Sequence, residues 1–160
     1  MDRFSDVFQI YYSRVYRFLL SLTGSIHQAE ELTQEVFYKA LFHIDQYRDD
    51  GHMYAWLCSI GKNAWIDCCR KSGNTAPLEE CDIPSEVSME DIIMKKELHA
   101  ALRRAILTLP EEYQEVVILH IYGEVPLKEI AIQRGKSESW GKVTFYRAKI
   151  MLKQRLEEFV

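Results

Sequence analysis

The side chains in this sequence with the widest range of possible chemistry are its four cysteines, Cys58, Cys68, Cys69 and Cys81. None of them forms a Cys-x-x-Cys pair, and no histidine lies at zinc-site spacing from them. Adjacent Cys68 and Cys69 are poorly placed to bind one metal ion together. No base that could activate their thiols is evident. We therefore expect reduced cysteines that serve as small apolar side chains, with no metal site, no cofactor and no catalytic group. A thiol or metal enzyme that uses Cys68 and Cys69 is kept as an alternative.

Basic side chains form the second group of residues whose type and spacing indicate a function. Seven basic residues and one acidic residue lie between positions 134 and 155, in a chain whose net charge is −4. Such a concentration of positive charge favours duplex DNA, because contact with phosphates releases condensed counterions. The alternative is a solvated basic helix with no ligand. The residues are Arg134, Lys136, Lys142, Arg147, Lys149, Lys153 and Arg155, against Glu138.

These basic residues belong to a predicted helix-turn-helix. Residues 127–131 place apolar groups three and four apart, which predicts a short helix. Gly135 suits the end of that helix, and Ser137 suits the N-cap of the next. In such a unit the second helix enters the major groove of DNA. Gly141 inside the second helix costs roughly 1 kcal/mol against alanine, so it indicates either a close backbone approach or a less regular segment.

An aromatic-rich helix is predicted over residues 53–71. It carries Tyr54, Trp56 and Trp65, and Lys62 and Asn63 share a face with further basic residues. Aromatic rings beside basic and amide groups suit single-stranded nucleic acid, because every base offers a face for stacking. Trp56 and Trp65 are equally well explained as core residues.

Helical apolar spacing runs through nearly the whole chain, and no hairpin signal interrupts it, so the predicted fold class is all-α. Residues 72–88 contain glycine, two prolines and four acidic residues but no basic one, which is typical of an exposed linker. We expect two small helical domains, residues 1–71 and 89–160, joined by this flexible acidic linker. No secretion signal, membrane-spanning stretch or further C-terminal domain is expected, which predicts a cytoplasmic protein.

Three segments in this order resemble bacterial RNA polymerase sigma factors of the extracytoplasmic-function (ECF) subfamily, within the sigma-70 family. The first is similar to the polymerase-binding helix of region 2. The second is similar to the helix that opens the −10 element. The third is similar to the opening of region 4. They are residues 28–40, 54–71 and 107–117, and the third continues through 128–131 and 143–149.

The resemblance implies a role for individual residues. The polymerase-binding residues would be Glu31, Gln34, Glu35 and Tyr38. Contacts to a melted −10 element would come from Trp56, Lys62, Asn63, Arg70 and Lys71, with a flipped base held by the loop at 45–52. Contacts to the −35 element would come from Ser137, Ser139, Trp140, Lys142, Val143, Tyr146 and Arg147. Residues 138–142 depart from the usual start of the family's recognition helix, which indicates a promoter sequence of its own.

The resemblance also implies partners. These are core RNA polymerase (the clamp of its largest subunit and its second-largest subunit), promoter DNA and an anti-sigma factor. The polymerase performs the chemistry, so the chain itself is not expected to be an enzyme. The alternative function is a helix-turn-helix regulator that acts without core polymerase. That alternative leaves the helices at 30–40 and 53–71 without a role.

Overall fold

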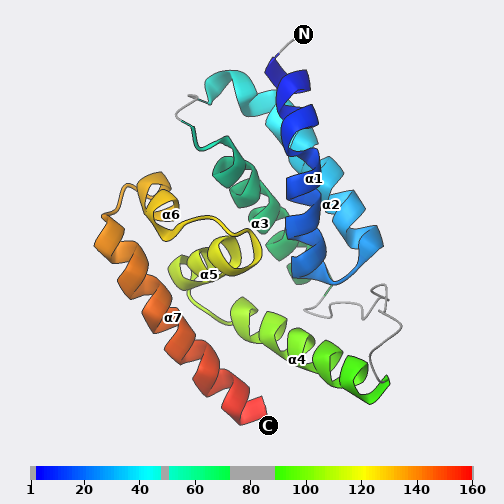
Figure 1. The fold of residues 1–160 in the computed structure, drawn as a ribbon, viewed down its shortest axis with the longest axis vertical. Helices are drawn as coiled ribbons and strands as arrows, with labels where there is room; N and C mark the ends of the chain where they lie inside the picture. The colour runs from blue at the N-terminus through cyan, green and yellow to red at the C-terminus, as the bar shows by residue number, and fades with distance from the viewer. Residues whose placement is uncertain (1–2, 48–50, 73–88, 160) are drawn as a thin grey trace.

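The computed structural model describes residues 3–47, 51–72 and 89–159, and every regular element in those residues is helical, as expected. The predicted linker therefore lies outside the described residues, apart from Ser72, and so does Cys81. Figure 1 shows the arrangement of the helices. The elements are α1 (Arg3–Thr23), α2 (Ile26–His43), a 3₁₀ turn η1 (Ile44–Gln46), α3 (Met53–Lys71), α4 (Met89–Leu107), α5 (Glu111–Val117), a π-helical turn η2 (Ile118–Tyr122), α6 (Leu127–Gln133) and α7 (Glu138–Phe159).

The first three helices pack on one another. The inner face of α1 is buried at Val15, Phe18 and Leu19, and Trp65 of α3 is only 1% exposed. Trp65 is thus a core residue, one of the two interpretations open from the sequence. The turn between α1 and α2 ends in Ser25, whose Oγ accepts a hydrogen bond from the Gln28 amide at 3.1 Å and so caps α2.

The last four helices form a second group, in which α7 packs against α4, α5 and α6. Ala148 and Leu152 of α7 are buried against this group, together with Val117 and Ile130. The α4 helix begins at Met89, the first residue of the second predicted domain.

The two groups of helices share one continuous hydrophobic core. The π-helical turn η2 packs against both α1 and α3, and Tyr54 donates a hydrogen bond from Oη to the Gly123 carbonyl at 2.9 Å. A second contact between the two groups involves Arg103 of α4, which is 6% exposed. Its guanidinium lies close to Gly24, in the turn between α1 and α2. The halves separated by the predicted linker therefore lie against each other, as Figure 1 also shows.

Candidate nucleic-acid and polymerase interface

The turn before α7 follows a defined backbone motif. Gly135 has φ +67°, a conformation that glycine adopts at no steric cost. The Lys136 amide donates to the Ala131 carbonyl at 2.8 Å and the Gly135 amide to the Ile132 carbonyl at 3.0 Å, the two bonds of a Schellman motif. Ser137 Oγ then accepts from the Trp140 amide at 3.2 Å and caps α7. The predicted glycine stop and serine cap are both confirmed.

Gly141 is required by a close approach of two helices. A Cβ at this position would lie 2.9 Å from the backbone oxygen of Leu127 and 3.6 Å from Cβ of Ala131. Of the two explanations for this glycine, the close backbone approach is correct, since α7 is regular here. The contact fixes α7 against α6, so it sets the angle at which the rest of α7 leaves the turn.

The outer face of α7 carries most of the residues predicted to contact the −35 element. Gly141, Thr144 and Ala148 are buried on the inner face. The exposed positions recur at three- and four-residue spacing, so they share the opposite face. Trp140 is half-buried, and the hydroxyl of Ser137 already serves as the cap. The exposed residues are Ser139, Lys142, Val143, Tyr146 and Arg147.

Not every basic residue counted near α7 is free for DNA. Arg134 is half-buried, and its guanidinium pairs with Glu115 through Nε and with Glu111 at 3.4 Å through Nη2. Lys142 lies 4.0 Å from Glu138, but both side chains are well exposed, so this pair is weak. The charge pattern of the sequence predicts Arg134 as part of the DNA-binding charge, whereas in the structure it contacts Glu111 and Glu115 of α5.

An exposed face of α2 carries the four residues predicted to bind polymerase, Glu31, Gln34, Glu35 and Tyr38. Two of their side chains make local ion pairs, His27 Nε2 to Glu31 at 3.0 Å and Lys39 to Glu35 at 3.1 Å.

Beside these polar groups lies an apolar patch that the sequence pattern did not predict. Leu41 is 48% exposed and Phe42 is 62% exposed, and the Phe42 ring contacts the Tyr38 ring at 5.1 Å. The helical spacing of Leu41 would also allow it to lie on the inner face of α2, because spacing alone does not show how wide the covered stripe is. The patch and the carboxylates together form an amphipathic surface.

The candidate −10 residues on α3 fall into two sets. Asn63, Arg70 and Lys71 are exposed. Trp56 is half-buried and stacks on Tyr47, with ring centroids 4.7 Å apart and planes at 23°. Part of the predicted loop at 45–52 (residues 48–50) lies outside the described residues, so the proposed base pocket is seen only at its edges.

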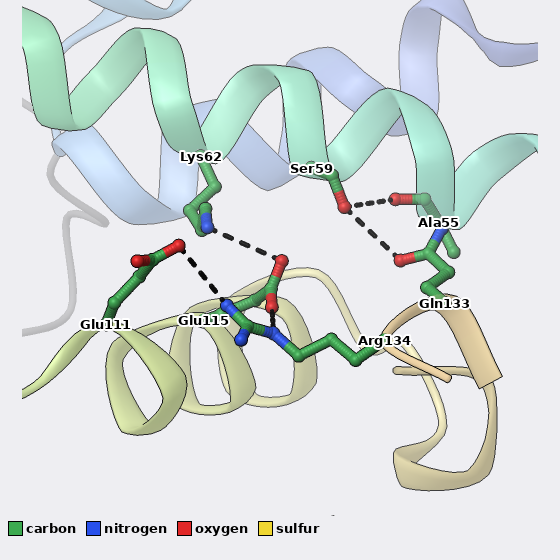
Figure 2. Close-up of polar contacts among 7 residues, drawn as sticks. All are labelled: Ala55, Ser59, Lys62, Glu111, Glu115, Gln133 and Arg134. Carbon is green, nitrogen blue, oxygen red and sulfur yellow. Dashed lines mark hydrogen bonds and ion pairs between the residues drawn. The ribbon is translucent and has the colours of Figure 1, made fainter. Parts of the chain in front are cut away.

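Lys62 differs from the expectation. Its side chain is only 3% exposed, and its Nζ lies 3.4 Å from Glu115 Oε1 on α5 (Figure 2). In this arrangement Lys62 cannot contact DNA, because the C-terminal half covers it. Ser59, one turn earlier, donates to Gln133 at 3.3 Å across the same boundary. No sequence pattern indicates Glu115 as a partner of α3.

The two buried cysteines lack the lowered pKa of an activated thiol. Cys58 and Cys69 are buried, and burial raises the pKa of the Cys58 thiol to about 12 and that of Cys69 to about 11. A nucleophilic cysteine needs a lowered pKa, so these shifts have the wrong direction for a thiol enzyme. Within the described part of the chain, no three potential ligands gather into a metal site. No helix of that part is long and apolar enough to span a membrane.

Comparison with protein families identifies two regions. Residues 7–75 match the model of sigma-70 region 2, and residues 99–152 match that of sigma-70 region 4. The chain belongs to the ECF sigma factors. The ECF RNA polymerase sigma factor SigM of Bacillus subtilis is 33% identical over 150 residues, which are 92% of this chain and 91% of SigM. SigW of the same organism is 27% identical, and the match covers 98% of this chain and 90% of SigW.

A solved structure has the same fold. It is the co-crystal structure of the sigma factor RpoE in complex with the anti-sigma factor NepR from Bartonella quintana. The TM-score is 0.60 at 20% identity, with 98% of both chains covered. The region 2 match covers α2 and α3, and the region 4 match covers the helix-turn-helix, so both candidate interfaces lie within family segments.

Proposed function

We propose that this sigma factor, which directs promoter-specific transcription, docks on core RNA polymerase through α2 and recognises its promoter with α3 and α7. The observation that supports the proposal is that α2 and α7 each have an exposed face of distinct composition. The α2 face combines carboxylates with Leu41 and Phe42, and the α7 face combines basic, aromatic and small polar groups. A protein surface suits the first and a DNA groove suits the second.

For docking, Glu31, Gln34, Glu35 and Tyr38 would contact the clamp of the largest polymerase subunit. Leu41 and Phe42 would add apolar area to the same interface, because the buried core of an interface is more apolar than the rest of the surface and is enriched in aromatic residues. Region 4 would lie near the second-largest subunit.

For promoter recognition, the exposed face of α7 would enter the major groove of the −35 element. Lys142 and Arg147 are suited to phosphate or guanine, while Val143 and Tyr146 offer apolar contact. On α3, Asn63, Arg70 and Lys71 would follow the single strand of the −10 element, with Trp56 as a stacking surface. Ser137, Ser139 and Trp140 complete the proposed −35 set at the start of α7.

The remaining expectations follow from this role. The polymerase would perform the chemistry, so the chain would not itself be an enzyme, and it would work in the cytoplasm with the polymerase. The similar structure holds a sigma factor with an anti-sigma factor, which supports the proposal that this chain also has an anti-sigma partner. A helix-turn-helix regulator independent of polymerase is not favoured, since it leaves the region 2 match at residues 7–75 without a function.

The direct test is run-off transcription on sheared genomic DNA of the host, with core polymerase in the presence and absence of the protein. We expect new, specific 5′ ends that share two spaced sequence elements. A double variant, Leu41→Asp with Phe42→Asp, should abolish both polymerase binding and the new 5′ ends, whereas the exposed control Gln9→Ala on α1 should change neither. Duplex binding without polymerase binding or new starts would overturn the proposal.

A further inference from the structure

An open cavity of about 550 Å³ lies where α1, α4 and the turn after η2 meet. None of the residues predicted to bind polymerase or promoter DNA lines it. Clefts of roughly 300–1,000 Å³ that combine apolar walls with a few convergent polar groups are the usual binding sites of small molecules. The cavity is therefore large enough for a ligand that the proposed function does not use. Its lining includes Arg14 and Arg17 of α1, Tyr54 of α3, His99 of α4, Tyr122 and Glu124.

Two arginines supply most of the positive charge of this lining. Arg14 and Arg17 are three residues apart, so both lie on one face of α1. The Arg14 guanidinium lies over the Tyr54 ring, with Cζ 3.9 Å from the ring centroid, and Arg17 Nε donates to the Ser13 carbonyl at 3.4 Å. Neither guanidinium forms an ion pair with a carboxylate of the described residues. Most of their N–H donors are thus available to an anion from solution.

Further basic side chains come from α4. His99 is exposed and lines the same cavity. Arg103 is buried near Tyr122, and its charge favours the ionised Tyr122 hydroxyl, although burial is the larger effect and raises the pKa of that hydroxyl. Guanidinium groups bind phosphate oxygens through charge-assisted hydrogen bonds that are roughly twice as strong as neutral ones. Basic side chains from two helices therefore favour a phosphate group in this cavity.

Glu124 adds a carboxylate to this basic lining and has an unusual backbone conformation. Its φ is +57°, in the left-handed region that is costly for a residue other than glycine. Backbone strain of this kind is concentrated at active sites and ligand-binding sites. A carboxylate repels a bare anion but accepts hydrogen bonds from hydroxyl groups. Glu124 therefore favours a ligand that has hydroxyl groups as well as a phosphate.

Together these side chains indicate one class of ligand. We propose that the cavity binds a small phosphate monoester that also carries hydroxyl groups, the chemistry that sugar phosphates and nucleotides share. Arg14 and Arg17 bind the phosphate. Glu124 accepts hydrogen bonds from the hydroxyl groups, and the Tyr122 ring contacts the apolar part of the ligand. The inference goes beyond the proposed function and does not depend on it, because no residue of the cavity is assigned to polymerase or DNA.

Isothermal titration calorimetry of the full chain tests the cavity with ribose 5-phosphate, AMP, inorganic phosphate and adenosine. We expect saturable one-to-one binding of at least one of the two esters. It should be at least about tenfold tighter than inorganic phosphate, which lacks the hydroxyl groups, and than adenosine, which lacks the phosphate. A preference for ribose 5-phosphate identifies a sugar phosphate, and a preference for AMP identifies a nucleotide. No saturable binding of either ester would overturn the proposal, and so would inorganic phosphate that binds as tightly as both.

Thermal unfolding gives a second measurement of the same binding. A ligand that binds the folded chain stabilises it by mass action, so the preferred ester at ten times its Kd should raise Tm by roughly 3–6 °C. An unchanged Tm at that concentration would show that the heat measured by calorimetry does not come from binding to the folded protein, and would refute the site.

Two variants and a control locate the binding. Arg17→Ala removes a phosphate contact and should weaken the preferred ester at least about tenfold. Glu124→Gln should weaken the ester by about threefold, because a charged acceptor is lost, but should not weaken inorganic phosphate. Lys128→Ala removes the same charge as Arg17→Ala from an exposed position on α6 outside the cavity, and it should leave the affinity unchanged.

Helical circular dichroism verifies that each variant is folded. The hydrogen bond of the Arg17 side chain lies within its own helix, so its loss should leave the packing of α1 intact. Equal losses of affinity in Arg17→Ala and Lys128→Ala would mean that the ester is attracted by the surface charge in general, and would overturn the assignment to this cavity.

Discussion

Replacement of Gly141 by alanine tests whether α7 is positioned by a close backbone approach. The new Cβ would lie 2.9 Å from the Leu127 carbonyl oxygen, which belongs to the backbone and cannot rotate away. Overpacking of this kind costs about 1–3 kcal/mol, whereas the higher helix propensity of alanine returns about 1 kcal/mol. We therefore expect Gly141→Ala to lower the free energy of unfolding by about 1 kcal/mol.

For a chain of this length, that loss corresponds to a decrease in Tm of roughly 3 °C. Thermal unfolding followed by circular dichroism measures it, with Gln154→Ala, at an exposed position on the same helix, as a control expected within about 0.5 kcal/mol of wild type. The variant should also weaken promoter binding, because relief of the contact turns α7 away from α6. An unchanged or higher Tm for Gly141→Ala would show that the helices are not held so closely, and would refute this explanation.

Four other changes have defined outcomes. Ser25→Ala removes the α2 cap and should cost about 1 kcal/mol in chemical denaturation, and no loss would mean that the cap is dispensable. Gly135→Ala should cost about 1–2 kcal/mol through its left-handed backbone alone, since nothing lies within 4 Å of the added Cβ; a neutral result would contradict the Schellman geometry. Cys58 and Cys69 have raised pKa values, so iodoacetamide should modify them only when the pH approaches those values or the protein unfolds, and rapid modification at neutral pH would refute their burial. Arg147→Ala should weaken holoenzyme binding to the promoter and reduce the slope of log affinity against log salt by about 1, and an unchanged slope would exclude a phosphate contact.

Local features of the fold were predictable because they depend on nearby residues. The apolar period and the flanking polar segments predicted α3 at its observed bounds, and the glycine and serine around the turn predicted the end of α6 and the start of α7. Backbone preferences and capping act within one helical turn, so a single sequence carries them. The −35 candidates on α7 came instead from the family resemblance.

Contacts between distant segments were not predictable in this way. Lys62 lies on a polar face of its helix by spacing, but only the fold shows that Glu115 covers that face. Arg134 was counted with the DNA-binding charges because the charge of a residue does not reveal that it forms ion pairs with acidic residues of another helix. Leu41 lies at a helical spacing that would allow it to face the core, yet its side chain is 48% exposed. For Lys62 and Arg134 the partner lies on another helix, far away in the sequence.

The central claim is that one chain recognises a promoter at two places, with α3 opening the −10 element and α7 holding the −35 element. Permanganate footprinting of a promoter found by run-off transcription tests it most directly, because permanganate reacts with unpaired thymines. We predict reactive thymines at the −10 element only when core polymerase and the protein are both present. Asn63→Ala should reduce this reactivity while polymerase binding is retained. Full thymine reactivity with Asn63→Ala, Arg70→Ala and Lys71→Ala combined would contradict the assignment of α3 to the −10 element.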